Sequence, residues 1–291
     1  MWVTAVYHQV SLFSLKPPDA TSTGGKSLLV PTPSSIKMAL LDAAIRTTGV
    51  QGGARIFPLL RDMAIALSPP PYIIVNNCFV RIQKPRRTES DSKRRRGKSV
   101  AEGEQAPPDE EQVAQESESE DVGSVLSSKE EDENRGDGKY VRSVAFREYV
   151  QYSGPLGLAV QTEAREDAIR LAQLLPLVNY LGKRGGFFQL DSPPTVRSQL
   201  PPRQGFLHLT ERTERHITEQ TEASMRGAES GSSVLLQLLD DWSPEMIFDQ
   251  VNVYAPSLAV GKDRLQRQVQ LPYRLLRSSH GFTLYQRTDI E

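Results

Sequence analysis

The hydrophobic pattern of the first 67 residues contains three periodic stretches, and each stretch predicts an element. Residues 3–13 alternate with a period of two, which is typical of a strand. Residues 33–48 have apolar side chains at helical spacing, behind Thr32 as N-cap and Pro33 in the first turn. Residues 54–67 repeat the helical spacing and end at three prolines. We therefore expect a strand followed by two helices.

Four further elements follow in the same way. Residues 72–83 are rich in Ile, Val and Phe and predict a second strand, and residues 144–152 predict a third. Residues 162–181 predict a helix bent near Pro176, and residues 187–190 a fourth strand. The order strand, helix, strand, strand, helix, strand is typical of the ferredoxin-like α+β fold. In that fold helices cover one face of an antiparallel sheet.

A charged segment separates the second and third predicted strands. Residues 84–98 contain eight basic side chains, and residues 101–138 contain 14 acidic and 2 basic ones. The segment has few apolar side chains to offset its ordering entropy, so we expect a disordered insertion at the tip between the two strands. Without residues 101–138 the chain has 33 basic and 22 acidic residues. This net charge of +11 favours a polyanionic partner.

These boundaries predict four regions. They are a first half of the ferredoxin-like domain at residues 1–83, the insertion at 84–140, a second half at 141–190, and an extended C-terminal region with a helix and a β-hairpin at 191–291.

The composition excludes several classes of protein. No apolar run approaches the roughly 18 residues of a membrane span, and Met1-Trp2 leads into no signal peptide, so we expect a cytoplasmic protein without membrane contact. The single cysteine, Cys78, excludes a disulfide framework and a multi-cysteine zinc site. The four histidines lack metal-ligand spacing, and we expect neither metal nor cofactor.

Three short segments are candidates for phosphate binding. Ser34, Ser35 and Lys37 lie in the first turns of a predicted helix, where backbone N–H groups are unpaired. The turn Lys183-Arg184-Gly185-Gly186 offers two cations beside residues without Cβ. The alternatives are an ordinary capped helix and an ordinary turn. Gly25-Lys26-Ser27 resembles the end of a phosphate-binding loop, but Ala20 stands where that loop needs glycine, and we reject it.

Aromatic side chains near basic residues are candidate stacking platforms for unpaired bases. Alternate aromatic residues on strands are usually core, and we expect this for most of the five, with Tyr149 or Tyr273 as the better candidates for stacking. The five are Tyr149, Tyr152, Phe187, Phe188 and Tyr273.

Five segments of the chain carry recognisable motifs. They are Pro31-Thr-Pro-Ser-Ser-Ile-Lys-Met-Ala-Leu-Leu, Val75-Asn-Asn-Cys-Phe-Val-Arg81, Arg147-Glu-Tyr-Val-Gln-Tyr152, Tyr180-Leu-Gly-Lys-Arg-Gly-Gly-Phe-Phe188, and Leu271-Pro-Tyr-Arg-Leu-Leu with Gly281-Phe-Thr-Leu-Tyr285. In this order they resemble the CRISPR-associated Cas-five family of the RAMP superfamily. The resemblance covers most of the chain outside residues 84–140 and about 191–230.

This resemblance implies a non-catalytic subunit of a type I CRISPR Cascade complex, an RNA-guided DNA-binding assembly of antiviral defence. Such a subunit holds the 5′ handle of the guide RNA (crRNA), joins the large subunit to the backbone subunits, and meets target DNA indirectly through the complex. The family carries a protruding thumb near the place of the charged segment, which is longer and more acidic here than an ordinary thumb. The RNA-binding residues expected are Ser34, Ser35, Lys37, Arg147, Lys183 and Arg184.

Two alternatives stay open. Some RAMP relatives are metal-independent endoribonucleases that process the guide precursor, and His8 or His280 would suit the acid–base chemistry. A scaffold that binds only protein is favoured if the positive charge is spread evenly rather than gathered on one face.

Overall fold

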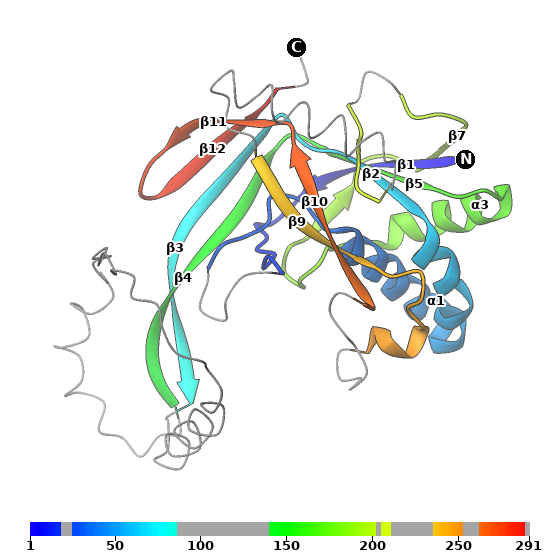
Figure 1. Ribbon diagram of the computed structural model, residues 1–291, viewed down its shortest axis with the longest axis horizontal. Helices are drawn as coiled ribbons and strands as arrows, with labels where there is room; N and C mark the ends of the chain where they lie inside the picture. Colours follow the sequence, from blue (N-terminus) through cyan, green and yellow to red (C-terminus); the bar gives the residue numbers. More distant parts are fainter. Residues whose placement is uncertain (19–24, 86–139, 202–204, 211–234, 253–261, 289–291) are drawn as a thin grey trace, which may run out of the picture. The chain divides into compact units, whose positions relative to one another are not determined.

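The structure, a computed structural model, describes residues 1–18, 25–85, 140–201, 205–210, 235–252 and 262–288 (Figure 1). The chain divides into two compact units. One combines residues 1–79 with 146–291, and the other spans residues 80–145. The predicted disordered insertion lies outside the described residues, apart from its first two positions and its last. None of the described helices combines the length and the apolarity needed to cross a membrane.

The first sheet is built around the N-terminal strand. Its main path runs β6-β1-β5-β2-β8, and each neighbouring pair is antiparallel. A further short strand, β7, pairs antiparallel with β1. The strands are β1 (Trp2–Gln9), β2 (Ala64–Ser68), β5 (Leu156–Gln161), β6 (Phe188–Leu190), β7 (Thr195–Arg197) and β8 (Leu207–His208).

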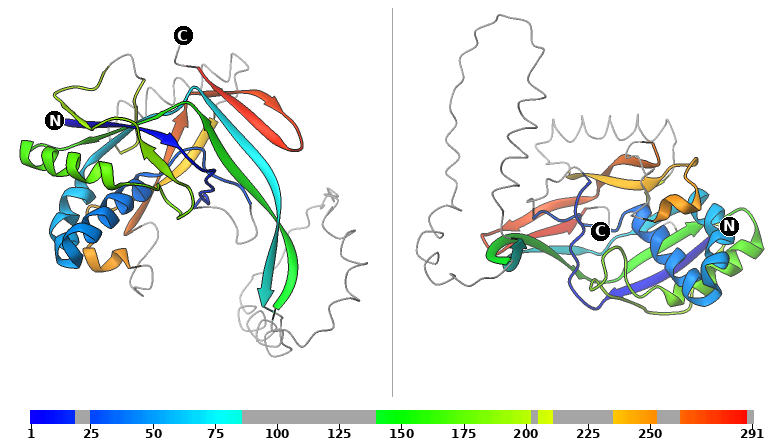
Figure 2. Two further views of the ribbon diagram at one scale, coloured as in Figure 1. Left: turned by 180° about the vertical axis from the view of Figure 1, so that it is seen from behind. Right: turned by 90° about the horizontal axis from the view of Figure 1, so that it is seen from below.

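Two helices contribute to the core beside this sheet, α1 (Pro33–Asp62) and α3 (Arg165–Leu174), and they contact each other (Figure 2). The 3₁₀ turn η1 (Leu175–Leu177) follows α3 directly. The Tyr7 hydroxyl donates to the carbonyl of Leu175 at 2.8 Å and so joins β1 to this turn. Burial raises the pKa of Tyr7, which keeps its hydroxyl a hydrogen-bond donor. The helix predicted over 162–181 is thus shorter in the structure, and the bend near Pro176 is a 3₁₀ turn.

Helix α1 consists of two helical halves that meet at Gly49, as the two predicted helices require. Gly49 has φ 73° and ψ 177°, far from helical values. The Lys37 ammonium, from the first half, donates to the Arg61 carbonyl in the second at 2.8 Å. In a straight helix these residues would lie about 36 Å apart, since each residue adds about 1.5 Å. The second half therefore runs back beside the first.

The start of α1 confirms the predicted cap, but its end differs from the prediction. The Thr32 hydroxyl accepts from the Ser35 N–H at 3.1 Å. The helix ends at Asp62, and residues 64–67, predicted as helical, belong to strand β2. Ile65 and Leu67 are fully buried in this strand, which pairs with β5 and β8. Strand pairing here outweighs a spacing that also suits a helix.

A second correction concerns the two inner strands. Residues 72–83 and 144–152 do form strands, β3 (Tyr72–Pro85) and β4 (Tyr140–Ser153), but these belong to a separate four-stranded sheet of order β11-β12-β3-β4. The strands that complete the first sheet are β2 and β5. Residues 156–161, which form β5, were not predicted as a strand at all. The α+β class with antiparallel sheets is confirmed, whereas the single sheet is wrong.

The C-terminal region adds strands to this second sheet and forms a third. Strand β12 (Phe282–Arg287) pairs with β3 and with β11 (Tyr273–Ser278). Among the described strands, β9 (Leu235–Trp242) and β10 (Arg264–Leu271) pair only with each other, and the 3₁₀ turn η3 (Phe248–Val251) lies between them in the chain. Strand β9 packs on α1, where the Trp242 and Phe57 rings lie 5.1 Å apart.

We expect Gly49→Ala to lower the free energy of unfolding by about 1–3 kcal/mol, because a Cβ is strained at this positive φ. Apart from the adjacent residues and nearby backbone of the same helix, no heavy atom of the described residues lies within 4 Å of the added Cβ, so the loss reports backbone strain rather than a clash. Urea unfolding measures it. Gly281→Ala is the matched control, since its Cβ also meets open space but its φ is not positive. Equal stability of the two variants would contradict the role of Gly49.

Candidate nucleic-acid interface

The start of α1 is not an open phosphate site. Ser34 is buried, and Lys37 is only 1% exposed. The Lys37 Nζ donates to Asp241 Oδ1 at 2.6 Å, in addition to its bond with the Arg61 carbonyl. The half-buried Ser35 uses its hydroxyl to donate to the Thr32 carbonyl at 2.8 Å. The structure therefore does not place the predicted residues Ser34, Ser35 and Lys37 where a phosphate would reach them together.

Lys37 instead forms a buried ion pair that joins α1 to β9. Burial lowers its pKa, and the carboxylate of Asp241 opposes this effect. Asp241 Oδ1 also accepts the Trp242 N–H at 2.7 Å, and Arg267 approaches Oδ2 at 3.8 Å. These partners supply the compensation that buried charges require. The sequence does not distinguish this lysine from an exposed one because Asp241 lies 204 residues away.

A different group of cations does come together. Five basic side chains line a hollow of about 540 Å³, which we call the basic hollow. Among the described residues that line it, none is acidic. The cations are Lys16 and Lys26 from the connection between β1 and α1, Arg147 from β4, and Lys183 and Arg184 from the turn before β6.

The turn that carries Lys183 and Arg184 is held by glycines in close contact with the rest of the chain. Gly182 and Gly185 have φ values of 87° and 106°. A Cβ at Gly186 would lie 2.7 Å from the Cβ of Phe13, so only glycine permits this approach. The turn therefore packs against the β1–α1 connection and leaves both cationic side chains exposed.

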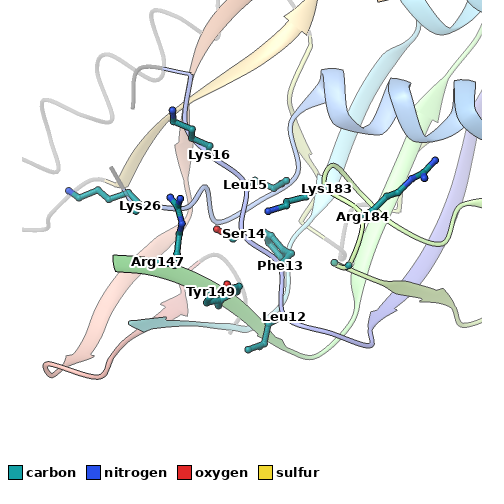
Figure 3. A pocket seen from close by; sticks show the side chains of 13 residues that line it. Leu12, Phe13, Ser14, Leu15, Lys16, Lys26, Arg147, Tyr149, Lys183 and Arg184 are labelled. Carbon is teal, nitrogen blue, oxygen red and sulfur yellow. The ribbon is translucent and has the colours of Figure 1, made fainter. Parts of the chain in front are cut away.

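Strand β4 supplies Arg147 and Tyr149 to the same hollow. The two residues are two positions apart and so project from the same face of the strand. Figure 3 shows Arg147 extending toward Lys16 and Lys26, and Lys183 extending toward Ser14, whereas Arg184 extends in the opposite direction. Three of the predicted residues, Arg147, Lys183 and Arg184, are therefore brought to one site.

Lys16 and Lys26 were not predicted as site residues. Lys26 was set aside with the incomplete phosphate-loop motif, and Lys16 precedes two prolines without other signal. Gly25, next to Lys26, permits this placement, since a Cβ there would overlap the carbonyl oxygen of Phe146. That close approach brings the segment before α1 against β4, where Arg147 lies.

Of the five candidate aromatic residues, three are core, one lines the basic hollow and one is exposed elsewhere. Tyr149 lines the basic hollow. Tyr152, Phe188 and Tyr273 are buried, and the hydroxyl of Tyr152 donates to the Leu29 carbonyl at 2.7 Å. Burial raises the pKa of Tyr152. The Tyr273 hydroxyl donates to the Pro70 carbonyl, so Tyr273 is not a stacking platform. Phe187 is exposed but does not line the hollow.

The two candidate catalytic histidines belong to different elements of the fold. His8 is on β1, where its Nε2 lies 3.1 Å from Asp191 Oδ1. His280 is exposed in the turn between β11 and β12, and its backbone carbonyl accepts from the side-chain amide of Asn77 at 3.1 Å. Neither is among the lining residues of the basic hollow.

Comparison with known proteins supports the family predicted from the sequence. No family model matches the chain. Over 91 residues the chain is 37% identical to CRISPR-associated protein Cas5 of Archaeoglobus fulgidus, a stretch that is 31% of this chain and 40% of that protein. The chain thus spans less than half the length of this relative. The predicted resemblance to the Cas5 family is confirmed.

Two solved structures are also similar. A CRISPR protein from Archaeoglobus fulgidus is 11% identical over 98% of this chain and 91% of its own, with a TM-score of 0.38. A chain of a CRISPR RNA-guided surveillance complex is 13% identical over 93% of this chain and 88% of its own, with a TM-score of 0.35. Both TM-scores are below 0.5, so neither likeness establishes a common fold.

We expect Asp241→Ala to lower the free energy of unfolding by about 3–5 kcal/mol, because it leaves the Lys37 ammonium buried without a counter-charge. The double variant Lys37→Met/Asp241→Leu should recover most of this loss. Denaturant unfolding of the single and double variants measures the coupling.

Asp62→Ala is the control for the ion-pair cycle. It removes a carboxylate from an exposed ion pair with Arg61, and we expect a loss below about 1 kcal/mol. If Asp241→Ala is as mild as Asp62→Ala, the buried pair does not hold α1 to β9.

Proposed function

Starting from its kinship with Cas5, we propose that the chain is a non-catalytic, guide-RNA-binding subunit of a type I CRISPR Cascade complex. In this proposal the basic hollow holds backbone phosphates of the 5′ handle of the crRNA. The chain joins the large subunit to the backbone subunits, and it contacts target DNA indirectly, through the complex. The proposed complex is a cytoplasmic ribonucleoprotein that acts in antiviral defence.

The basic hollow is the observation that carries this proposal. Five cations from three separate segments repel one another, and none of the described lining residues is acidic. An RNA backbone supplies one negative charge per nucleotide and would neutralise several of the cations at once. The gathering of charge on one site also argues against a scaffold that binds only protein, for which we expected an even spread.

Tyr149 favours single-stranded RNA over a duplex at this site. Its ring lines the hollow beside Arg147, and an unpaired base stacks on such a ring for about 1–3 kcal/mol. Bases in a helix are already stacked and present mainly phosphate and ribose to a protein. A flexible handle offers both its phosphates and its bases.

The strand order supports a ferredoxin-like core for this function. The chain forms the units β1-α1-β2 and β5-α3-β6, which β3 and β4 separate in sequence, and the strands of these units lie in the order β6-β1-β5-β2. This is the order that two interleaved β-α-β units produce in a ferredoxin-like sheet. Because many unrelated proteins share that fold, the proposal depends on the hollow and on the family rather than on the topology.

The position of the histidines favours binding without cleavage. Acid–base cleavage of RNA needs two proton-transfer groups near the 2′-OH and the leaving oxygen. His8 is on β1 of the first sheet, His280 is in the turn between β11 and β12, and neither lines the basic hollow. The metal-independent endoribonuclease therefore has no observation of its own in its favour.

We expect the full chain to bind a labelled, mixed-sequence RNA octamer, with affinity that falls steeply with salt. Lys183→Gln and Arg147→Gln should each weaken binding several-fold and make the salt slope shallower by about 0.7, the value for one phosphate contact on a single strand. Fluorescence anisotropy at four salt concentrations measures both quantities.

Arg55→Gln controls for the loss of one positive charge. Arg55 is exposed on α1 and does not line the hollow, so its salt slope should stay at the wild-type value. RNA binding that is absent, or a slope that Arg55→Gln changes as much as Lys183→Gln does, would contradict the proposed site.

A repeat-containing precursor RNA should remain uncut when incubated with the full chain in the absence of metal, because the hollow brings no histidine to the bound strand. Denaturing gels read the outcome. Cleavage at one position that His8→Ala or His280→Ala abolishes would establish the ribonuclease instead.

A further inference from the structure

A second hollow of about 360 Å³ adjoins the basic hollow, and Lys26 lines both. Its walls come from β9, β12, β3, β4 and the segment before α1, and all of its lining residues belong to the unit of residues 1–79 and 146–291. Leucine and valine side chains form much of these walls. The polar groups among them include Glu148, Gln237, Thr283 and Tyr285.

Glu148 is held in place by bonds to the segment before α1. Its backbone N–H donates to the Gly25 carbonyl at 2.8 Å, and its Oε2 accepts the Ser27 N–H at 2.8 Å. Its other carboxylate oxygen has no hydrogen-bond partner among the described residues. Glu148 and the half-buried Tyr285 line the same hollow, and burial and the negative charge of Glu148 both raise the pKa of Tyr285.

Gln237 is oriented from the opposite side of the hollow. Its Oε1 accepts the Leu29 N–H at 2.9 Å, which fixes the amide so that the NH₂ group is the free end. Within the described part of the chain, that NH₂ group has no acceptor. The second hollow therefore combines a fixed acceptor, a fixed donor and apolar walls.

This chemistry differs from that of the basic hollow. The carboxylate of Glu148 repels phosphate, so the second hollow does not extend the path of the RNA backbone. A nucleobase suits it, because a base has apolar faces and a polar edge with both donors and acceptors. Lys26 would hold a phosphate where the two hollows meet.

We propose that the second hollow takes a guanine base of the RNA strand whose phosphates lie in the basic hollow. Guanine alone among the four bases presents two adjacent N–H donors, N1–H and N2–H, which suit the carboxylate of Glu148. Its neighbouring O6 accepts from the Gln237 NH₂. Bonds to a charged acceptor are stronger than neutral ones, so Glu148 dominates the selection. This inference rests on the proposed RNA-binding function.

Selection from a random pool of single-stranded RNA octamers tests the inference, because the pool offers every base at every position. The full chain is incubated with the pool, and the bound fraction is sequenced. At one position we expect the ratio of guanine to each other base to rise about fivefold or more over the input pool, the lower range for a good bidentate contact. Glu148→Gln keeps an acceptor for the Ser27 N–H but weakens the pairing with N1–H and N2–H, and the enrichment should fall below about twofold.

Glu163→Gln is the matched control, because Glu163 is exposed, does not line the second hollow and loses the same charge. It should retain the enrichment. RNA binding without guanine enrichment, or enrichment that Glu148→Gln leaves intact, overturns the inference while the proposed function stands. Absence of binding to the whole pool overturns the proposed function and this inference with it.

Discussion

The reversal of α1 at Gly49 is the constraint on which the rest of the core depends. A positive φ turns the second helical half back along the first, and the Lys37 ammonium bonds both to a carbonyl of that half and to Asp241 of β9. Because a buried ammonium without a counter-charge is costly, β9 has little freedom to move away. Strand β9 also carries Gln237, which accepts an N–H from the segment before α1, and that segment contains Lys26. The ion pair therefore supports both hollows through backbone that it holds in place, without touching either.

Local sequence patterns predicted the helices and strands better than they predicted which strands pair with each other. The cap at Thr32, the two helical halves and strands β1, β3, β4 and β6 follow from periodicity and from proline and glycine signals, since these depend on neighbouring residues. Strand β5 was missed because the short apolar run after Gly154 and Pro155 has no distinctive period, and residues 64–67 of β2 suit two periods equally. Which strands share a sheet depends on pairing across the whole chain, so the predicted single sheet was wrong.

The site shows the same division between local and distant information. Lys183 and Arg184 are recognisable because glycines surround them, and Arg147 because the family motif contains it. Lys37 was an equally good candidate by sequence, since it lies in the first turns of a predicted helix, yet its buried ion pair with Asp241 makes it a structural residue. Lys16 and Lys26 had poor local settings, and the contact of Gly25 with Phe146 brings their segment to the hollow. Burial decides the role of a lysine, and burial is a property of the fold rather than of the motif.

The carboxylate of Glu148 makes the second hollow chemically different from the basic hollow. In a cluster made only of cations, an RNA strand would slide from one phosphate register to the next, since every phosphate is alike. In the proposed complex, the carboxylate of Glu148 in the second hollow would repel the backbone, and the apolar walls around it would accept a base but not a phosphate. Lys26 lines both hollows, so the strand would change from one kind of contact to the other at this lysine. Phosphate contacts would then supply affinity, and the position of a single carboxylate would supply the register.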